Sequence, residues 1–221
     1  MNNKQYKVDL HTHSIISPDG GIRAEQYEKL LEQGVLDCIA ITDHNETRFA
    51  RVLQEKFEEK IIVGEEITTT DGEMIGLFLE KVIPSGLTAK QTAAAIHEQG
   101  GLVLIPHPFE IFRKGIQRSV LEKIAEEIDI MEVFNGRGRF RGKSTEAESF
   151  ANEFHLTKAA SSDAHGYKGI GKTFSVVNKI PDRNSLKQLL QEGTVEKGYA
   201  PLWTFLYPSM NKIKNKFILG V

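Results

Sequence analysis

The sequence of 221 residues has a single cysteine, Cys38, and little excess of charge of either sign. One cysteine cannot form a disulfide within the chain and offers a zinc ion no second thiolate, so we expect Cys38 to be an inert residue in a reducing compartment. With 28 basic and 30 acidic residues, the formal net charge is −2. A chain without a strong positive field is not expected to bind duplex DNA stably.

Long apolar stretches are also missing. The first residues, Met-Asn-Asn-Lys-Gln-Tyr-Lys, contain no apolar run of the signal-peptide type, and no later run is long enough to cross a bilayer. We therefore expect a cytoplasmic protein without a transmembrane segment. Its oligomeric state stays open at this point.

Short apolar runs alternate with amphipathic stretches, and the length suits one α/β domain. Thr88 and Gln91 have the spacing of a helix capping box, and Asp71-Gly72 predicts a hairpin turn. Strands are predicted over residues 8–10, 37–42, 61–63, 66–70, 73–79, 102–105, 128–134, 158–161 and 173–177. Helices are predicted over residues 24–33, 46–58, 88–99, 119–127, 145–154 and 185–191. About seven strand–helix units indicate parallel pairing and favour an α/β barrel over an open sheet.

Five of the seven histidines stand at the ends of predicted strands. They belong to four segments: Asp-Leu-His-Thr-His (9–13), Thr-Asp-His (42–44), Ile-Pro-His-Pro (105–108) and Ser-Asp-Ala-His (162–165). Residues two apart in an extended segment project to the same side, so His11 and His13 can face one ion, and so can Asp163 and His165. This pattern predicts a metal centre.

A barrel gives a reason for distant residues to meet, because the residues after parallel strands converge on one face. The residues expected there are His11, His13, His44, Glu66, His107, Asp163 and His165. The two other histidines, His97 and His155, lie in or beside predicted helices without an acidic or histidine partner placed in the same way. We interpret both as surface or core residues.

Six ordered segments together resemble the polymerase and histidinol phosphatase (PHP) superfamily, over roughly residues 7 to 180. They are Asp-Leu-His-Thr-His-Ser (9–14), Ile-Thr-Asp-His-Asn (41–45), Gly-Glu-Glu-Ile-Thr (64–68), Pro-His-Pro-Phe (106–109), Glu-Val-Phe-Asn-Gly-Arg (132–137) and Ser-Ser-Asp-Ala-His (161–165). The resemblance implies a distorted seven-stranded (β/α) barrel of the PHP type. It also implies a phosphoric ester hydrolase with two or three divalent ions (Mn²⁺, Fe²⁺ or Zn²⁺) and a metal-bound hydroxide.

The resemblance further implies which residues bind each ion. One ion takes His11, His13, Glu66 and Asp163. A second ion shares Glu66 as a bridge and adds His107, and a third takes Asp19, His44 and His165. Glu66, His107 and Asp163 are the implied catalytic residues.

Two positions depart from the most frequent pattern of the family. Asp19 stands where many members have histidine and others aspartate, so the third site keeps one more anionic ligand. Glu73 stands where many relatives have histidine. The second ion then has either an extra carboxylate ligand or one ligand fewer. Carboxylates suit harder ions, so Mn²⁺ or Fe²⁺ gains over Zn²⁺.

Three further acidic residues lie next to the expected ligands. Asp9 and Asp43 precede metal-bound imidazoles by two residues and one, and we interpret them as carboxylates that orient a ring or the backbone from outside the ligand set. Glu65 stays an alternative to Glu66 as the bridge, because a shift of one residue reverses the face of a strand. The leaving group has no clear proton donor, although His107 or a metal-bound water could serve.

Basic residues near two strand ends are candidates for binding the substrate. The first group is Asn135, Arg137, Arg139 and Arg141, in a loop with glycines at 136, 138 and 142 that allow close approach. Arg113-Lys114 forms a second group. A guanidinium suits a phosphate or carboxylate that is not cleaved. The alternative is that these loops are simply solvated basic surface.

The last segment, residues 201–221, differs in composition from the PHP domain expected over residues 1–200. It has Leu-Trp-Thr-Phe-Leu-Tyr (202–207) followed by Lys212, Lys214 and Lys216. We expect a tail or helix that packs on the barrel. A membrane-surface helix or a dimer contact is the alternative.

The function expected from these residues is metal-dependent hydrolysis of a small phosphorylated metabolite, a nucleotide or a short oligonucleotide. A histidinol-phosphate or phosphoprotein phosphatase is an alternative, since the same centre could serve it. A catalytically silent metal-binding module with a structural or partner-binding role is an alternative of another class.

Overall fold

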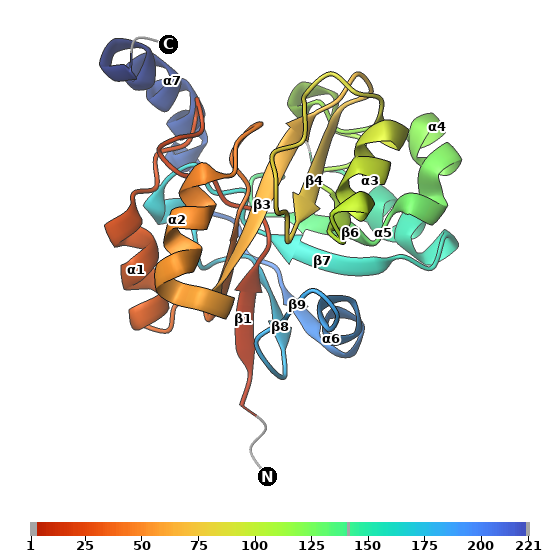
Figure 1. Ribbon diagram of the computed structural model, residues 1–221, viewed down its shortest axis with the longest axis horizontal. Helices are drawn as coiled ribbons and strands as arrows, with labels where there is room; N and C mark the ends of the chain where they lie inside the picture. Colours follow the sequence, from red (N-terminus) through yellow and green to blue (C-terminus); the bar gives the residue numbers. More distant parts are fainter. Residues whose placement is uncertain (1–3, 141, 220–221) are drawn as a thin grey trace.

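The computed structural model describes residues 4–140 and 142–219. Within these residues one sheet has nine strands in the spatial order β7-β6-β5-β4-β3-β2-β1-β8-β9. The strands are β1 (Tyr6–Asp9), β2 (Cys38–Ile41), β3 (Ile61–Thr68), β4 (Glu73–Leu77), β5 (Leu102–Ile105), β6 (Ile130–Asn135), β7 (Thr157–Ser161), β8 (Phe174–Val177) and β9 (Thr194–Glu196). The sheet curves into a nearly closed barrel (Figure 1). The predicted α/β barrel is therefore confirmed.

The hairpin predicted at Asp71-Gly72 is confirmed, and the parallel pairing expected of the strand–helix units does not extend to the whole sheet. β1, β2 and β3 pair in parallel, as do β5, β6 and β7, but β4 is antiparallel to both of its neighbours. Residues 69–72 leave room only for a hairpin turn between β3 and β4, because a parallel return needs a much longer crossover. β8 is antiparallel to β1 for a similar reason, since only the short 3₁₀ helix Tyr167–Gly169 stands between β7 and β8. The three-residue strand β9 was not predicted.

The described helices lie outside the sheet (Figure 1). They are α1 (Ala24–Glu32), α2 (Arg48–Phe57), α3 (Ala89–Glu98), α4 (Arg118–Leu121), α5 (Ser144–Glu153), α6 (Leu186–Glu192) and α7 (Tyr207–Leu219). The capping box before α3 is confirmed, because the Gln91 amide donates to the Thr88 hydroxyl and the Thr88 amide donates to the Gln91 side chain. The helix predicted over residues 119–127 is instead the single turn α4 followed by a 3₁₀ helix, Glu122–Glu127.

Apolar side chains fill the end of the barrel away from the strand-end histidines. Val8, Ile62 and Leu104 belong to one buried cluster with Leu186 and Leu189 of α6. Cys38 is buried in the same cluster, and burial raises the pKa of its thiol above the ordinary value, as expected of an inert thiol. The polar residues are thus concentrated at the opposite rim.

That rim closes across the ends of β1 and β7. The amide of Asp163 donates to the carbonyl of His11 at 3.0 Å, and the amide of His13 donates to the carbonyl of Ala164 at 3.0 Å. Lower down, β8 lies against β1, and the amide of Ala160 in β7 donates to Ser175 of β8. The first and last segments of the histidine pattern are therefore joined by backbone hydrogen bonds.

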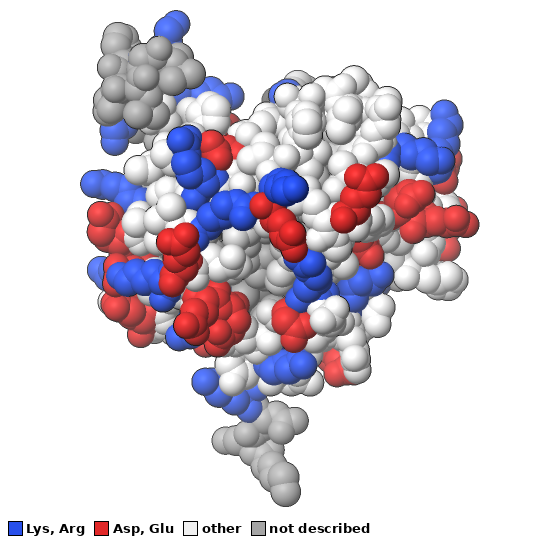
Figure 2. All heavy atoms as spheres, viewed as in Figure 1, with Lys and Arg blue, Asp and Glu red and all other residues white. Residues whose placement is uncertain are grey.

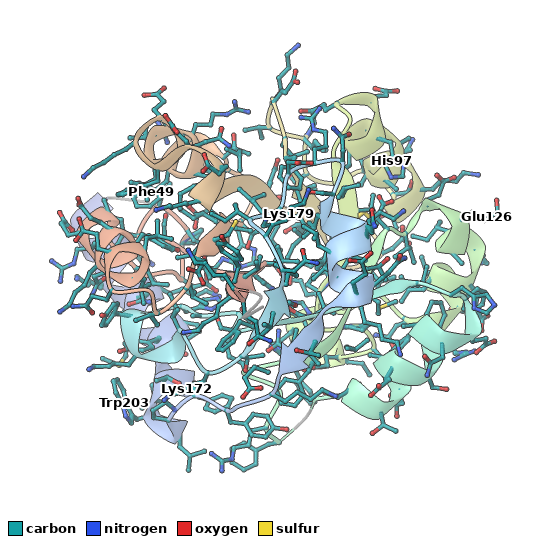
Figure 3. All side chains as sticks on the ribbon, turned by 90° about the horizontal axis from the view of Figure 1, so that it is seen from below. Phe49, His97, Glu126, Lys172, Lys179 and Trp203 are labelled. Atoms are coloured by element: carbon teal, nitrogen blue, oxygen red, sulfur yellow. The ribbon has the colours of Figure 1, made fainter. Side chains whose placement is uncertain are left out.

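His97 lies at the periphery of the molecule (Figure 3), and its Nε2 is 2.9 Å from a carboxylate oxygen of Asp129. The surface position agrees with the sequence interpretation, and the acidic partner comes from a distant part of the chain. Asp129 follows the 3₁₀ helix after α4, so nothing in the local spacing around His97 indicates the pair.

The C-terminal segment continues from a 3₁₀ helix, η5 (Leu202–Leu206), into α7. The side chain of Asn211 donates to the carbonyls of Asp19 and His165 at 2.9 and 2.8 Å. This segment therefore contacts the histidine-bearing rim. None of the described helices combines the length and apolar character needed to cross a membrane.

Candidate metal centre

The extended backbone after β1 turns His11 and His13 to the same side. Their Nε2 atoms lie 3.0 Å apart, while the hydroxyl of Thr12 between them donates to the carbonyl of Ala40 in β2. Both rings are fully buried. The two-residue spacing therefore does bring both imidazoles to one point.

Glu66 lies at the middle of the histidines. Its Oε2 is 3.4 Å from His11 Nε2, 3.2 Å from His13 Nε2 and 3.3 Å from His44 Nδ1. Its Oε1 is 3.0 Å from Nε2 of His107. One oxygen of this carboxylate thus faces three imidazoles and the other oxygen faces a fourth.

Glu65 points to the other face of β3. Its Oε2 accepts the amide of Ile83 at 2.9 Å, and the side chain is buried among residues outside the histidine cluster. Of the two alternatives, the structure places Glu66 at the centre.

Asp163 approaches the same point from the end of β7. Its Oδ1 lies 3.6 Å from His11 Nε2, 3.5 Å from His13 Nε2 and 3.4 Å from His165 Nδ1. Asp163 and His107 adopt left-handed backbone conformations, with φ of 52° and 30°. Such conformations cost a non-glycine residue roughly 1 to 3 kcal/mol and are concentrated at functional sites.

Asp19 adds a carboxylate on another side of the cluster. Its Oδ1 lies 3.6 Å from His44 Nε2, and its Oδ2 lies 3.5 Å from His165 Nε2. Glu73 of β4 also faces the cluster, with oxygens 4.0 Å from His44 Nδ1 and 3.9 Å from His107 Nε2. Both positions that depart from the usual family pattern therefore lie within reach of the histidines.

Four overlapping groups of these residues have donor atoms close enough to hold an ion, within 4.8 Å of one another. The groups are His13-Asp19-His44-His165, His11-His13-Asp163, His11-Glu66-His107 and His44-Glu66-Glu73. Imidazole nitrogens combined with carboxylate oxygens are a donor set for Mn²⁺, Fe²⁺ or Zn²⁺. The residues present therefore fit a cluster of divalent ions.

The electrostatics of the cluster match this donor set. Burial opposes ionisation of Glu66, but the surrounding imidazoles, His44 and His11 foremost, hold its pKa well below the usual range. Burial also opposes ionisation of Asp163, where Arg137 and His11 keep the pKa low. Both carboxylates are therefore charged at neutral pH.

The imidazoles divide into two kinds. Burial and the neighbouring Arg137 lower the pKa of His165 to about 3, and burial lowers the pKa of His44. Burial alone would also lower the pKa of His13, but Asp163 and Glu66 raise it to about 9. A metal ion would have to displace that proton, so binding would release protons and strengthen with pH.

Glu132 is a buried carboxylate that was not predicted from the sequence, and it contacts two residues of the cluster. Oε1 of Glu132 in β6 lies 3.3 Å from Nδ1 of His11, and its Oε2 accepts the amide of His107 at 2.7 Å. The only sequence signal was one acidic residue inside an apolar strand. By contrast, Asp9 accepts the amides of His11 and Ser162, and Asp43 accepts the amide of Ser14, so both orient backbone rather than a ring.

Two arginines that line a cavity above the cluster approach Asp163. Arg113 donates from Nη1 to Asp163 Oδ2 at 2.7 Å and to the side-chain oxygen of Asn135 at 2.7 Å, while Arg137 Nη1 lies 3.4 Å from both Asp163 oxygens. Arg139 lies away from the cluster, with its guanidinium over the ring of Tyr199. Position 141, the remaining arginine of the predicted loop, lies outside the described residues.

A cavity of about 390 Å³ opens above the cluster. Its lining includes the cluster residues Asp19, His44, Glu66, Glu73, His107, Asp163 and His165, and the cationic residues Arg113, Lys114, Arg137 and Lys212. The cavity thus has carboxylates and imidazoles at its floor and positive charge around them, which suits an anionic ligand.

Comparisons with known proteins agree with this architecture. Residues 143–195 match the model of a family described as PHP-associated. Two uncharacterized proteins of Methanocaldococcus jannaschii are relatives. MJ1587 is 35% identical over 146 residues, which are 60% of this chain and 84% of that protein. MJ0417 is 34% identical over 200 residues, which are 83% of this chain and 77% of that protein.

Solved structures share the fold. A two-domain protein of Bacteroides vulgatus containing a predicted PHP-like metal-dependent phosphoesterase superposes with a TM-score of 0.67 at 20% identity, over 95% of this chain and 70% of that one. The lesion-specific endonuclease PfuEndoQ of Pyrococcus furiosus superposes with a TM-score of 0.63 at 15% identity, over 84% of this chain and 56% of that one. With the strand-end motifs, the family match and the two sequence relatives taken together, the chain belongs to the PHP family.

Proposed function

We propose that this protein is a phosphoric ester hydrolase whose substrate is a small phosphorylated metabolite, a nucleotide or a short oligonucleotide. The observation that carries the proposal is the position of Glu66, whose two oxygens lie within 3.4 Å of four imidazoles from three different segments of the chain. A buried carboxylate held among imidazoles in this way is suited to setting the spacing of two neighbouring divalent ions.

The proposed ligands fall into three sets. His11, His13, Glu66 and Asp163 would hold one ion, and Glu66, His107 and Glu73 a second. Asp19, His44 and His165 would hold a third, to which His13 is also close. When bound, such ions supply Lewis acidity toward the phosphoester oxygens and lower the pKa of a water. Mn²⁺, Fe²⁺ or Zn²⁺ suits this mixture of nitrogen and oxygen donors.

The side chains above the cluster would bind the anionic substrate. Arg113 and Arg137 both line the cavity and already contact a carboxylate, Asp163, with distances of 2.7 and 3.4 Å. Arg113 contacts Asp163 through Nη1 alone, since its Nε and Nη2 donate to Glu110. A guanidinium N–H that binds a carboxylate can also bind a phosphate. The cavity volume of about 390 Å³ is within the range of small-molecule sites.

The arrangement of charge supports a metal site rather than an ordinary packed core. A buried cluster with several carboxylates and imidazoles has a large desolvation cost, and a purely structural site could replace it with apolar residues at less cost. The likeness of fold to PfuEndoQ makes a short nucleic acid a candidate substrate beside metabolites and nucleotides.

The test begins with protein stripped of metal and checked by elemental analysis. Addition of Mn²⁺ should then restore hydrolysis of p-nitrophenyl phosphate or of bis-p-nitrophenyl phosphate, and the preferred ester distinguishes a monoesterase, which includes histidinol-phosphate and phosphoprotein phosphatases, from a diesterase. A panel of nucleotides and oligonucleotides follows. Full turnover without metal would refute the mechanism. No turnover of any ester with full metal content would favour the silent module.

A further inference from the structure

The helix at the C-terminal end is amphipathic in the reverse of the usual sense. An amphipathic helix of a globular protein normally turns its apolar side to the core. Among the α7 side chains that the structure describes, residues 207–216, Asn211 donates to the carbonyls of Asp19 and His165, and Asn215 donates to those of Ser17 and Pro18. The ring of Tyr207 also lies against Gly166. The contact is close, because a Cβ atom on Gly21 would lie 2.8 Å from the Asn211 amide nitrogen.

Four apolar side chains in the described part of this segment face outward. Trp203, Leu206, Met210 and Ile213 are 53%, 59%, 59% and 62% exposed. Their spacing of three or four residues aligns them along one side of the continuous helical stretch formed by η5 and α7. We call these four residues the outer stripe. Trp203 stands at the edge of the molecule in Figure 3.

The charge beside the outer stripe has one sign. Lys212, Lys214 and Lys216 are exposed on α7, and the sequence from position 197 to position 221 contains four lysines and no acidic residue. In Figure 2 blue and white spheres of this segment stand out at the upper left, beside atoms that are not described. A second copy of the same surface would bring lysines against lysines with no carboxylate in the segment to pair with them, which disfavours a symmetric dimer through the stripe.

We propose that the outer stripe docks on the surface of an anionic lipid membrane. Exposed aliphatic side chains with a tryptophan, flanked by lysines, are the features by which a helix lies in the headgroup region of an anionic bilayer. The same helix lines the cavity through Pro208 and Lys212, so docking would hold the cavity mouth beside the lipid headgroups. The proposal concerns binding and does not depend on the proposed hydrolase activity.

Vesicle binding by the full chain tests the proposal directly. Flotation with phosphatidylcholine vesicles should show binding only when phosphatidylglycerol is included, and added NaCl should weaken it. Trp203 is the single tryptophan of the sequence, so its emission should shift to shorter wavelength on binding. The double variant Lys214→Glu, Lys216→Glu should lower the partition coefficient by at least about tenfold, since each basic residue near an anionic surface contributes about 1 kcal/mol.

A matched pair of apolar substitutions completes the test. Met210→Asp with Ile213→Asp should abolish vesicle binding, whereas Val52→Asp, at a 60% exposed site on α2, should leave it unchanged. Circular dichroism establishes that each variant is folded. The proposal would be overturned if the wild-type protein did not bind anionic vesicles, or if all variants bound them equally. A dimer that Met210→Asp disrupts, without vesicle binding, would assign the stripe to a second copy instead.

Discussion

Glu132 and His11 form a buried carboxylate–imidazole pair, with Glu132 Oε1 at 3.3 Å from His11 Nδ1. The other ring nitrogen of His11 faces Glu66 and Asp163, so Glu132 can fix the tautomer and orientation of a ring that we propose as a metal ligand. Carboxylates in this position commonly change metal affinity by about 10- to 100-fold when they are removed.

Glu132→Gln should therefore weaken binding of Mn²⁺ by about 10- to 100-fold while the protein stays folded. Metal affinity is measured by competition with a chelator. Glu126→Gln, on the exposed side of the preceding 3₁₀ helix (Figure 3), is the control and should bind Mn²⁺ like the wild type. Unchanged affinity in Glu132→Gln would mean that the pair with His11 is only structural.

Glu66 and Glu65 provide a comparison between neighbours on opposite faces of β3. Glu66→Gln should lower phosphoesterase turnover by more than about 100-fold, since removing a ligand should cost more than removing an outer partner. Glu65→Gln should lower it less than about tenfold, because a glutamine oxygen can still accept the Ile83 amide. Turnover and metal content are measured together, and equal losses in two folded variants would show that Glu66 has no special role.

Arg137 and Arg139 separate the two interpretations of the basic loop. If Arg137 binds a phosphate that is not cleaved, Arg137→Ala should raise KM for a bisphosphorylated nucleotide or oligonucleotide by about 10- to 100-fold, the effect of one charge-assisted hydrogen bond. KM for p-nitrophenyl phosphate should change little. Arg139→Ala, which removes the guanidinium over Tyr199, should leave both values unchanged. If Arg137→Ala changed KM equally for both substrates, the loop would be solvated basic surface and not a phosphate-binding site.

Glu73 decides the composition of the second ion site. If Glu73 is a ligand there, Glu73→Ala should lower the manganese content per chain and Glu73→His should raise the zinc content, because imidazole suits zinc and carboxylate suits manganese. Metals per chain are measured by elemental analysis. Glu80→Ala, at an exposed position after β4, is the control. An alanine variant with its full manganese content would reject Glu73 as a ligand.

The metal-free protein should lose stability as the pH rises from about 6 to 9. Burial raises the pKa of Asp9 to about 7, and the carboxylates Asp163 and Glu66, working against burial, raise the pKa of His13 to about 9. The folded state therefore binds these protons more tightly than the unfolded state, whose pKa values are about 3.9 and 6.5. Their contribution is complete below the unfolded pKa and is lost as the pH passes the folded pKa.

Thermal denaturation in the presence of a chelator should show a falling melting temperature over that interval. Metal-loaded protein should show a smaller fall, since a coordinated imidazole at His13 carries no proton to lose. A melting temperature of the metal-free protein that rises steadily from pH 6 to 9 would contradict the prediction.

The histidines at the rim of the barrel could be predicted because each is identified by residues next to it in the sequence. His11 and His13 show their common direction by a spacing of two residues, and each strand-end histidine follows its own apolar run. Glu132 could not be identified in this way, because its partners, His11 and the His107 amide, are 121 and 25 residues away. Long-range pairing has no periodic signature in a single sequence.

The direction of strands was predictable only where the connection constrains it. The Asp71-Gly72 turn indicated the hairpin of β3 and β4, but no local pattern shows that β8 turns back against β1. For the C-terminal helix, the sequence predicted the element but not which of its sides faces the barrel. Its side chains suggest an ordinary packed helix, whereas the contacts of Asn211 with two rim carbonyls reverse which side faces the barrel.

The closure between the ends of β1 and β7 has a consequence for how the molecule holds itself together. His11 and His13 stand on one side of this seam, and Asp163 and His165 on the other. Backbone hydrogen bonds and the Ser162 amide, which donates to Asp9, join the two edges. An ion held by both pairs would cross-link the two edges and so join residues about 150 positions apart in the chain. Hydrogen exchange at the amides of His13 and Asp163 would then report metal occupancy from the backbone itself.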